Sequence, residues 1–266
     1  PEFLYEKSKN KTRVVITGSH GKTTITSMIL HVLNFHNKNT DFMVGAQLEG
    51  FDCMVKLTNE NDFMVLEGDE YLSSALDSKP KFLHYKPNIA LLSGISWDHI
   101  NVFKTEEDYT NQFSKLIESI TSGGVLVYNE KDEKVVECVN NSENYFRKIP
   151  YKTPNYNIIN GITNLETDLG EIPLSIFGKH NLQNLEGAKQ ICLQMGIIEE
   201  EFYEAIMSFS GASKRLEKIN RKDNIKFTLQ VFTKFILSKH RVQNLCFIML
   251  SKDSFRSILP GQNRSK

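Results

Sequence analysis

The chain has 266 residues, of which 40% are hydrophobic, and it carries 32 acidic and 32 basic residues. This length fits one large domain or two small ones, with enough apolar content for a buried core. No run of about 18 apolar residues and no secretion signal is evident, so we expect no membrane span and a cytoplasmic location. The four cysteines are isolated and lack metal-site spacing, which fits reduced thiols.

Apolar runs typical of buried strands alternate with helical patterns along most of the chain. The strand-like runs are 14–16, 63–66, 89–92 and 125–128, and the helical patterns are 25–33, 106–120, 181–195 and 199–209. This alternation predicts an α/β fold with a mostly parallel sheet and flanking helices. The stretch 146–177 has short β-like pieces between turn residues, so we expect a small antiparallel β appendage there.

The segment Thr17–Thr24, with the sequence TGSHGKTT, joins the first strand to the first helix. Strand, glycine loop, Gly-Lys-Thr and helix is the arrangement that binds nucleotide phosphates through backbone N–H groups and a helix N-terminus. Lys22 would reach the β- and γ-phosphates, and the hydroxyl of Thr23 would hold Mg²⁺. The common form has glycine where this chain has Ile16, so the loop is a shorter variant. The alternative is a glycine turn with a surface lysine.

Polar residues follow two further strand runs. The acidic segment Glu67–Glu70 follows the run 63–66, and Trp97–His99 follows the run 89–92. The carboxyl ends of parallel strands gather ligand groups, carboxylates suit Mg²⁺, and a neutral imidazole can ligate a metal. The alternatives are a solvated acidic loop and a structural histidine.

Two later segments are candidates for nucleotide contacts. Asn181 begins a helical pattern that it could cap, and Asn184 lies one turn further on nearly the same face. Alternatively, the two amides could hydrogen-bond a purine or ribose. The basic segment Ser213–Arg215 is either a surface patch or places an arginine against phosphate.

In order and approximate spacing, these five motifs resemble those of the Mur ligases, ATP-dependent enzymes that build the peptidoglycan stem peptide. The resemblance covers residues 12 to about 217, the central ATPase domain of that family. The stretch 81–99 looks most like the branch that contains UDP-N-acetylmuramate–L-alanine ligase and the muropeptide-recycling ligase.

The resemblance implies roles for individual residues, with ATP and Mg²⁺ as cofactors. Lys22, Glu67 and His99 would be catalytic, and Thr23, Glu67 and His99 would hold the metal. The residues expected to bind ATP are Gly18, Ser19, His20, Gly21, Lys22, Thr23, Thr24, Asn181, Asn184 and Arg215. Some family members carry a carbamylated lysine, and Lys115 lies close to that place.

The resemblance also predicts the domain organisation. Residues 1–11 would be a connector from an N-terminal domain that this chain lacks, and residues 12–217 the ATP-binding domain. Residues 216–266 carry 11 Lys+Arg and 3 Asp+Glu, a net charge of +8, whereas residues 1–215 carry −8. Because the charge changes abruptly and the family's third domain is not recognisable, we expect 218–266 to be an aberrant or truncated tail. Strands are conceivable there at 227–232 and 244–250.

The predicted function is ATP-dependent carboxylate–amine ligation on UDP-N-acetylmuramate, through an acyl phosphate, with an amino acid or peptide as second substrate of the full-length parent. We expect the chain by itself to be inactive as a ligase. The alternatives are a nucleotide-binding remnant or regulatory fragment, or another P-loop NTPase or kinase. A nucleic-acid partner is disfavoured, because the only basic region is the tail.

Overall fold

The computed structural model describes residues 1–48, 50–98, 101–211, 216–222, 225–230 and 247–249. The chain divides into two compact units, Pro1–Ala212 and Ser213–Lys266. In the part of the chain that is described, no helix is both long and apolar enough to cross a membrane.

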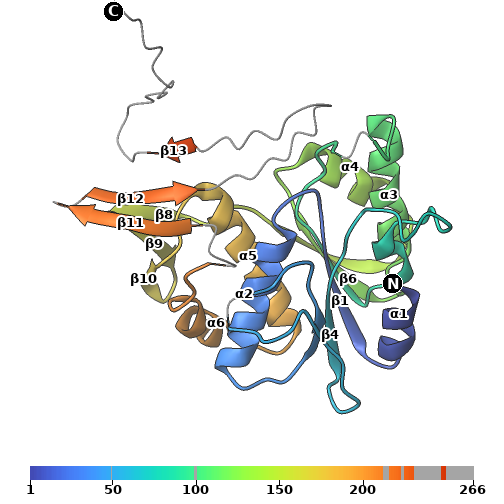
Figure 1. Cartoon of the computed structure of the whole chain (residues 1–266), viewed down its shortest axis with the longest axis horizontal. Helices are drawn as coiled ribbons and strands as arrows, with labels where there is room; N and C mark the ends of the chain where they lie inside the picture. The colour runs from blue at the N-terminus through green and yellow to red at the C-terminus, as the bar shows by residue number, and fades with distance from the viewer. Residues whose placement is uncertain (49, 99–100, 212–215, 223–224, 231–246, 250–266) are drawn as a thin grey trace, which may run out of the picture. The chain divides into compact units, whose positions relative to one another are not determined.

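The first unit is built on a seven-stranded sheet (Figure 1). Its strands are β1 (Thr12–Thr17), β2 (Asp41–Met43), β3 (Val55–Lys56), β4 (Phe63–Glu67), β5 (Ile89–Leu92), β6 (Gly124–Asn129) and β7 (Phe146–Tyr151). Their order in the sheet is β3-β2-β4-β1-β5-β6-β7, and all neighbours are parallel except β2 and β3. The predicted α/β fold with a mostly parallel sheet is confirmed.

Helices cover both faces of this sheet. They are α1 (Glu2–Ser8), α2 (Lys22–Phe35), η1 (Lys81–His84), α3 (Glu106–Glu118), α4 (Glu133–Asn141), α5 (Lys179–Gln194) and α6 (Glu199–Ile206). Helices α2, α5 and α6 contribute to the core on one face, and α3, α4 and η1 to the core on the other. In Figure 1, α2 and α5 lie side by side on their face.

The strand residues divide between these cores with the period of two that a pleated sheet requires. In β1, Val14 and Ile16 pack toward α2 and α5, whereas Val15 packs toward α3. All three side chains are fully buried. The continuous apolar runs in the sequence are therefore strands that are covered on both faces.

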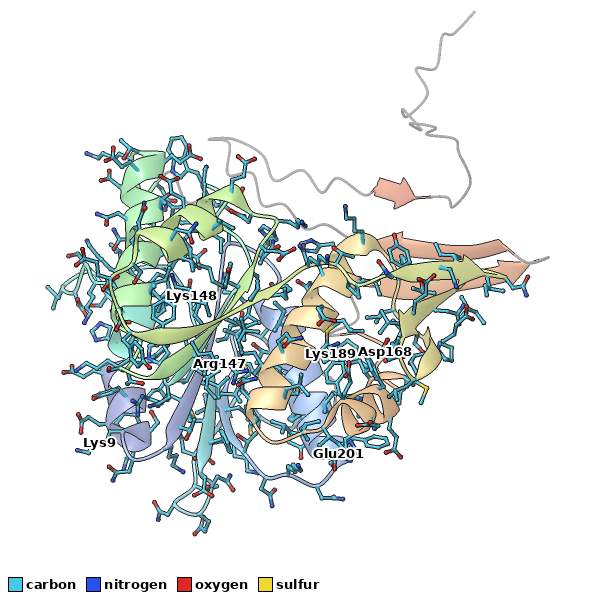
Figure 2. The ribbon with its side chains drawn as sticks, turned by 180° about the vertical axis from the view of Figure 1, so that it is seen from behind. Lys9, Arg147, Lys148, Asp168, Lys189 and Glu201 are labelled. Carbon is cyan, nitrogen blue, oxygen red and sulfur yellow. The ribbon has the colours of Figure 1, made fainter. Side chains whose placement is uncertain are left out.

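One part of the sequence interpretation is wrong. Residues 146–151 form β7, which pairs in parallel with β6 at one edge of the main sheet. Only β8 (Tyr156–Ile159), β9 (Ile162–Thr167) and β10 (Gly170–Leu174) form the antiparallel appendage. The side chains of Arg147 and Lys148 project from β7 (Figure 2), and Arg147 is exposed, so the strand lacks the apolar run that marks a central strand.

The second unit contains β11 (Leu216–Lys222), β12 (Ile225–Gln230) and β13 (Phe247–Met249) in an antiparallel sheet, in that order. β12 and β13 fall within or beside the stretches 227–232 and 244–250, where strands were conceivable. Positions 231–232, 244–246 and 250 of those stretches lie outside the described residues.

The order of the strands fixes where a ligand would gather. β1 lies between β4 and β5. The strands β2, β3 and β4 lie on one side of β1, and the chain then crosses to the other side, where β5, β6 and β7 follow. In open α/β sheets, ligands bind beyond the carboxyl ends of the strands at such a switch point. The segment Thr17–Thr24 leaves β1 at this place.

Candidate functional site

The glycine loop between β1 and α2 depends on two glycines with positive φ. Gly18 has φ 124°, and Gly21, the N-cap of α2, has φ 82°. A Cβ atom at Gly18 would lie 2.2 Å from Ser93 Oγ, just beyond β5. Only glycine fits a backbone of this conformation against so close a neighbour. The loop is therefore packed directly on the end of β5, and its helix begins at Lys22.

Lys22 lies at the start of α2, and its ammonium is turned back over the loop. Its Nζ donates to the Gly18 carbonyl oxygen at 2.6 Å and to Glu70 Oε2 at 2.7 Å. The Lys22 side chain is 15% exposed to solvent, whereas the Glu70 side chain is 1% exposed. A partly accessible cation thus lies at the N-terminus of a 14-residue helix, where the helix dipole also favours an anion.

Thr23 and Glu67 are neighbours across the same site. Thr23 Oγ1 donates to Glu67 Oε1 at 2.7 Å, and the backbone N–H of Gly45 donates to Glu67 Oε2 at 2.9 Å. Glu67 is the last residue of β4, and Ile16 of β1 lies opposite it in register. Hydroxyl and carboxylate oxygens are hard donors of the kind that Mg²⁺ takes, and Mg²⁺ commonly uses only one or two protein carboxylates. These two residues therefore fit a magnesium ion beside the loop.

The other loop residues contact the ends of β5, α3 and α5. Ser19 Oγ lies 2.9 Å from the Tyr109 hydroxyl and accepts from the Ser96 backbone N–H at 2.8 Å. The His20 carbonyl oxygen accepts from Ser93 Oγ at 2.5 Å, and the His20 ring lies 5.1 Å from that of His180. Thr24 continues the first turn of α2. The loop is thus fixed by side chains from three different segments.

Asn181 and Asn184 of α5 differ in their position relative to the glycine loop. Asn184 is buried, and a Cβ atom at Gly21 would lie 2.5 Å from its Oδ1, so Asn184 lies against the loop. Asn181 does not cap the helix, contrary to one interpretation of the sequence. The N-cap is Gly178, with φ 88°, and Asn181 Nδ2 donates to the Phe177 carbonyl oxygen at 2.9 Å. Because α5 begins at Lys179, Asn181 lies within its first turn.

The acidic segment after β4 does not act as one cluster. Asp69 pairs with Lys81 of η1 at 2.7 Å, whereas Glu70 pairs with Lys22. Burial alone would raise the pKa of Asp69, but hydrogen bonds from Lys81 and the Tyr71 backbone N–H outweigh it and lower that pKa. Glu67, Asp69 and Glu70 thus have three different partners.

Several predicted residues lie elsewhere. His99 and Arg215 fall outside the described residues, so their predicted roles stay predictions. Lys115 is an exposed residue of α3, whose buried face consists of Tyr109, Phe113, Leu116 and Ile117. Within the described residues, no group of three or more His, Cys, Asp or Glu side chains is placed to hold a metal.

Sequence reasoning missed three residues that support the site. Ser93 and Tyr109 contact the loop, and Asp132 accepts from the Ile95 backbone N–H at 3.0 Å while capping α4. Tyr109 was recognisable only as part of a buried helix face. Asp132 had a local signal, because Val135, Cys138 and Val139 follow it at helical spacing.

Comparison with known proteins identifies the family. Residues 16–192 match the family model described as the Mur ligase middle domain. The chain belongs to the Mur ligase family. This match spans the glycine loop, β4, β5 and all but the last two residues of α5, so the Mur ligase resemblance of the sequence is confirmed.

Two curated relatives with named activities are similar to this chain. The chain is similar to the UDP-N-acetylmuramate–L-alanine ligase of Caldicellulosiruptor saccharolyticus, with 32% identity over 84% of this chain and 50% of the relative. It is also similar to the UDP-N-acetylmuramate–L-alanyl-gamma-D-glutamyl-meso-2,6-diaminoheptandioate ligase of Haemophilus influenzae, with 24% identity over 82% of this chain and 50% of the relative. The chain thus spans about half the length of the curated relatives it matches.

Solved structures agree on the fold. A UDP-N-acetylmuramate:L-alanyl-gamma-D-glutamyl-meso-diaminopimelate ligase from Neisseria meningitides superposes with a TM-score of 0.69, at 23% identity, over 80% of this chain and 71% of that one. The UDP-N-acetylmuramate-alanine ligase of Thermotoga maritima superposes with a TM-score of 0.63, at 19% identity, over 83% of this chain and 50% of that one. At these identities the likeness concerns the fold alone.

Proposed function

We propose that this Mur ligase chain binds ATP with Mg²⁺ at the Thr17–Thr24 loop, as the ATP-binding part of a carboxylate–amine ligase. The observation that carries this proposal is the juxtaposition of Lys22, Thr23 and Glu67 at the carboxyl end of β1. Backbone N–H groups, an ammonium and two hard oxygen donors meet there, and this is the set that a triphosphate and its metal require.

Each residue has a defined task in this proposal. The loop amides and Lys22 would neutralise charge on the β- and γ-phosphates. Thr23 and Glu67 would hold the magnesium ion, which supplies positive charge beside the transferring phosphoryl group. Asn184 and Asn181, on α5, would contact the adenosine. His99 would complete the metal ligands, and Arg215 would contact phosphate.

The proposed reaction has two steps. A carboxylate oxygen of UDP-N-acetylmuramate attacks the γ-phosphorus, ADP leaves, and an acyl phosphate forms. An amine then adds to the acyl carbon, and inorganic phosphate leaves from the tetrahedral intermediate. Positioning and electrostatic stabilisation supply most of the catalysis in such phosphoryl transfers. The amine is L-alanine or a preformed peptide, because relatives named for both are similar to this chain.

We also propose the division into residues 1–11 as a connector, 12–217 as the ATP-binding domain and 218–266 as a separate tail. The described site residues serve ATP and its metal. We therefore propose that residues 1–266 alone do not complete the ligation, because the chemistry needs ATP, carboxylate and amine in near-attack geometry. The alternative of another P-loop NTPase or kinase is set aside by the match to the Mur ligase middle domain.

Two measurements test this proposal. Calorimetric titration with ATP, with and without Mg²⁺, should show binding to the wild-type chain. Phosphate release is then measured with ATP, UDP-N-acetylmuramate and either L-alanine or the tripeptide. Absence of ATP binding would contradict the site assignment. Substrate-dependent release at about 1 s⁻¹ or faster would contradict the proposed inactivity of the isolated chain.

A further inference from the structure

Glu70 is a buried carboxylate whose role no motif explains. It lies three residues beyond the end of β4, and its side chain is 1% exposed to solvent. Burying a charge is costly unless it is paired and hydrogen-bonded. One carboxylate oxygen of Glu70 pairs with Lys22 Nζ at 2.7 Å. The other accepts from the Tyr109 hydroxyl at 3.2 Å.

Tyr109 connects this pair back to the glycine loop. Its hydroxyl also lies 2.9 Å from Ser19 Oγ. A phenol has one hydrogen to donate. Since Tyr109 donates it to Glu70, the Ser19 hydroxyl is the donor in the 2.9 Å contact with Tyr109, and the Gly94 carbonyl oxygen, at 3.4 Å, is the more distant acceptor for the same hydrogen. A chain of contacts therefore runs from Ser19 through Tyr109 and Glu70 to Lys22, and it begins and ends in the loop.

The protonation state of Tyr109 supports its role as the donor in the hydrogen bond to Glu70. Burial raises the pKa of Tyr109, and the charge of Glu70 raises it further. The phenol therefore keeps its proton near neutral pH and remains a donor. The carboxylate of Glu70 thus has donors on both of its oxygens.

The Lys22 ammonium has three N–H donors. One points to the Gly18 carbonyl oxygen and one to Glu70. The flexible side chain of a lysine gives its ammonium many possible positions, and two such contacts restrict them.

We propose that Glu70 is a positioning residue for Lys22. It fixes the ammonium over the loop, so that the third N–H is directed to the phosphates, and Tyr109 orients Glu70 for this task. This proposal rests on the proposed binding of ATP. A different role would be simple repulsion of the triphosphate by a nearby negative charge, which predicts the opposite effect of removing that charge.

The variant for the test is Glu70→Gln. It keeps the volume and one acceptor oxygen but removes the charge, whereas truncation of a buried ion pair destabilises the fold strongly. Its matched control is Glu199→Gln, because Glu199 of α6 pairs at 2.9 Å with Lys189 of α5, another largely buried lysine. Thermal melting is recorded for both variants, so that affinities are compared on folded protein.

The first readout needs no nucleotide. The rate at which an acylating reagent modifies each lysine amine is measured by peptide mass spectrometry on the full chain. An ion-paired ammonium must leave its partner before it reacts. We expect Glu70→Gln to raise the modification rate of Lys22 severalfold and Glu199→Gln to leave it unchanged. An unchanged Lys22 rate in Glu70→Gln would overturn the proposal.

The second readout is the Kd for Mg·ATP from calorimetry. When one charge-assisted hydrogen bond becomes neutral, we expect the Kd of Glu70→Gln to rise about tenfold. Glu199→Gln should match the wild-type chain. An equal or lower Kd in Glu70→Gln would show that Glu70 does not position Lys22 for phosphate. If the wild-type chain binds no Mg·ATP, the proposed function fails, and the modification rate still reports the Glu70–Lys22 contact.

A third comparison tests the role of Tyr109. Tyr109→Phe removes only the hydroxyl. If that hydroxyl acts through Glu70, the Kd of the double variant Glu70→Gln/Tyr109→Phe should equal that of Glu70→Gln alone. Effects that multiply in the double variant would show that the two residues act independently.

Discussion

Thr23 and Glu67 are 44 positions apart in the sequence, yet Thr23 Oγ1 lies 2.7 Å from Glu67 Oε1. The contact exists because β1 and β4 are parallel neighbours, so the helix that follows β1 begins beside the last residue of β4. A single hydrogen bond thus marks the place where the glycine loop meets a carboxylate suited to Mg²⁺.

The first prediction concerns this contact. Thr23→Val keeps the side-chain shape but removes the hydroxyl that would hold the metal. The wild-type chain should bind ATP more tightly with Mg²⁺ than without it, and we expect this gain in affinity to be smaller in the variant, because Glu67 then holds the metal without the hydroxyl. Calorimetry at several Mg²⁺ concentrations measures this. Thr105→Val, at the N-cap of α3, is the control and should keep the Mg²⁺ dependence. A Thr23→Val chain with wild-type Mg²⁺ dependence would contradict the metal assignment.

The second prediction concerns Lys22. Lys22→Ala removes the ammonium from the loop, and we expect the affinity for Mg·ATP to fall by about 100-fold, roughly 2.7 kcal/mol. The phosphates would then meet only backbone dipoles and the metal. Calorimetric titration compares this variant with Lys9→Ala. Lys9 is an exposed lysine at the C-cap of α1 and is labelled in Figure 2. The loop assignment would be wrong if the Lys22 and Lys9 variants bound ATP equally.

Much of this arrangement was predictable from the sequence. The runs 14–16, 63–66 and 89–92 mark strands buried on both faces, and carboxyl ends of parallel strands meet at one edge. The sequence pattern alone therefore predicts that Glu67 lies near the glycine loop. It could not distinguish Glu67 from Glu70, because the partner of each carboxylate depends on the register between β1 and β4.

The residues that sequence reasoning missed share a physical cause. The spacing of Tyr109 and Phe113 indicated only a buried helix face, since periodicity reports which side of a helix is covered and not what its hydroxyl reaches. Strand β7 was misassigned because an edge strand exposes polar side chains and loses its apolar run. Long-range hydrogen bonds and edge strands are set by tertiary packing, which local patterns do not encode.

The third prediction concerns the pH dependence of stability. Asp41 is fully buried and accepts from Lys11 Nζ at 2.7 Å, from Thr58 and from Asn61. Burial would raise the pKa of Asp41, but these hydrogen bonds outweigh it, so that the folded-state pKa lies below its ordinary value of 3.8. A lowered pKa means that this group stabilises the fold above about pH 4 and loses that contribution as the pH falls further.

Asp41→Asn removes the charge and leaves the ammonium of Lys11 buried without its partner. We expect a loss of about 3–5 kcal/mol in unfolding free energy at pH 7 and a smaller loss at pH 3. Urea unfolding at both pH values measures the difference. Glu6→Gln, which breaks an exposed pair with Lys9, should change stability little at either pH. An Asp41→Asn effect that grows on acidification would contradict the stated direction of the pKa shift.

The last prediction links the backbone of the loop to the site. Gly18→Ala places a Cβ atom at φ 124° and 2.2 Å from Ser93 Oγ, with the backbone nitrogens of Ser93 and Gly94 at 3.0 Å. Two costs add there, backbone strain and overpacking, and we expect a loss of about 2–4 kcal/mol in unfolding free energy.

Gly161→Ala is the matched control. Gly161 also has positive φ, 76°, but a Cβ atom there meets nothing within 4 Å. The control therefore carries the strain alone, and it should lose about 1 kcal/mol. The difference between the two variants in urea unfolding isolates the contact of the loop with the end of β5. Because that contact also fixes the loop, Gly18→Ala should weaken Mg·ATP binding whereas Gly161→Ala should not. Equal losses of stability in both variants would show that the loop is not pressed against Ser93.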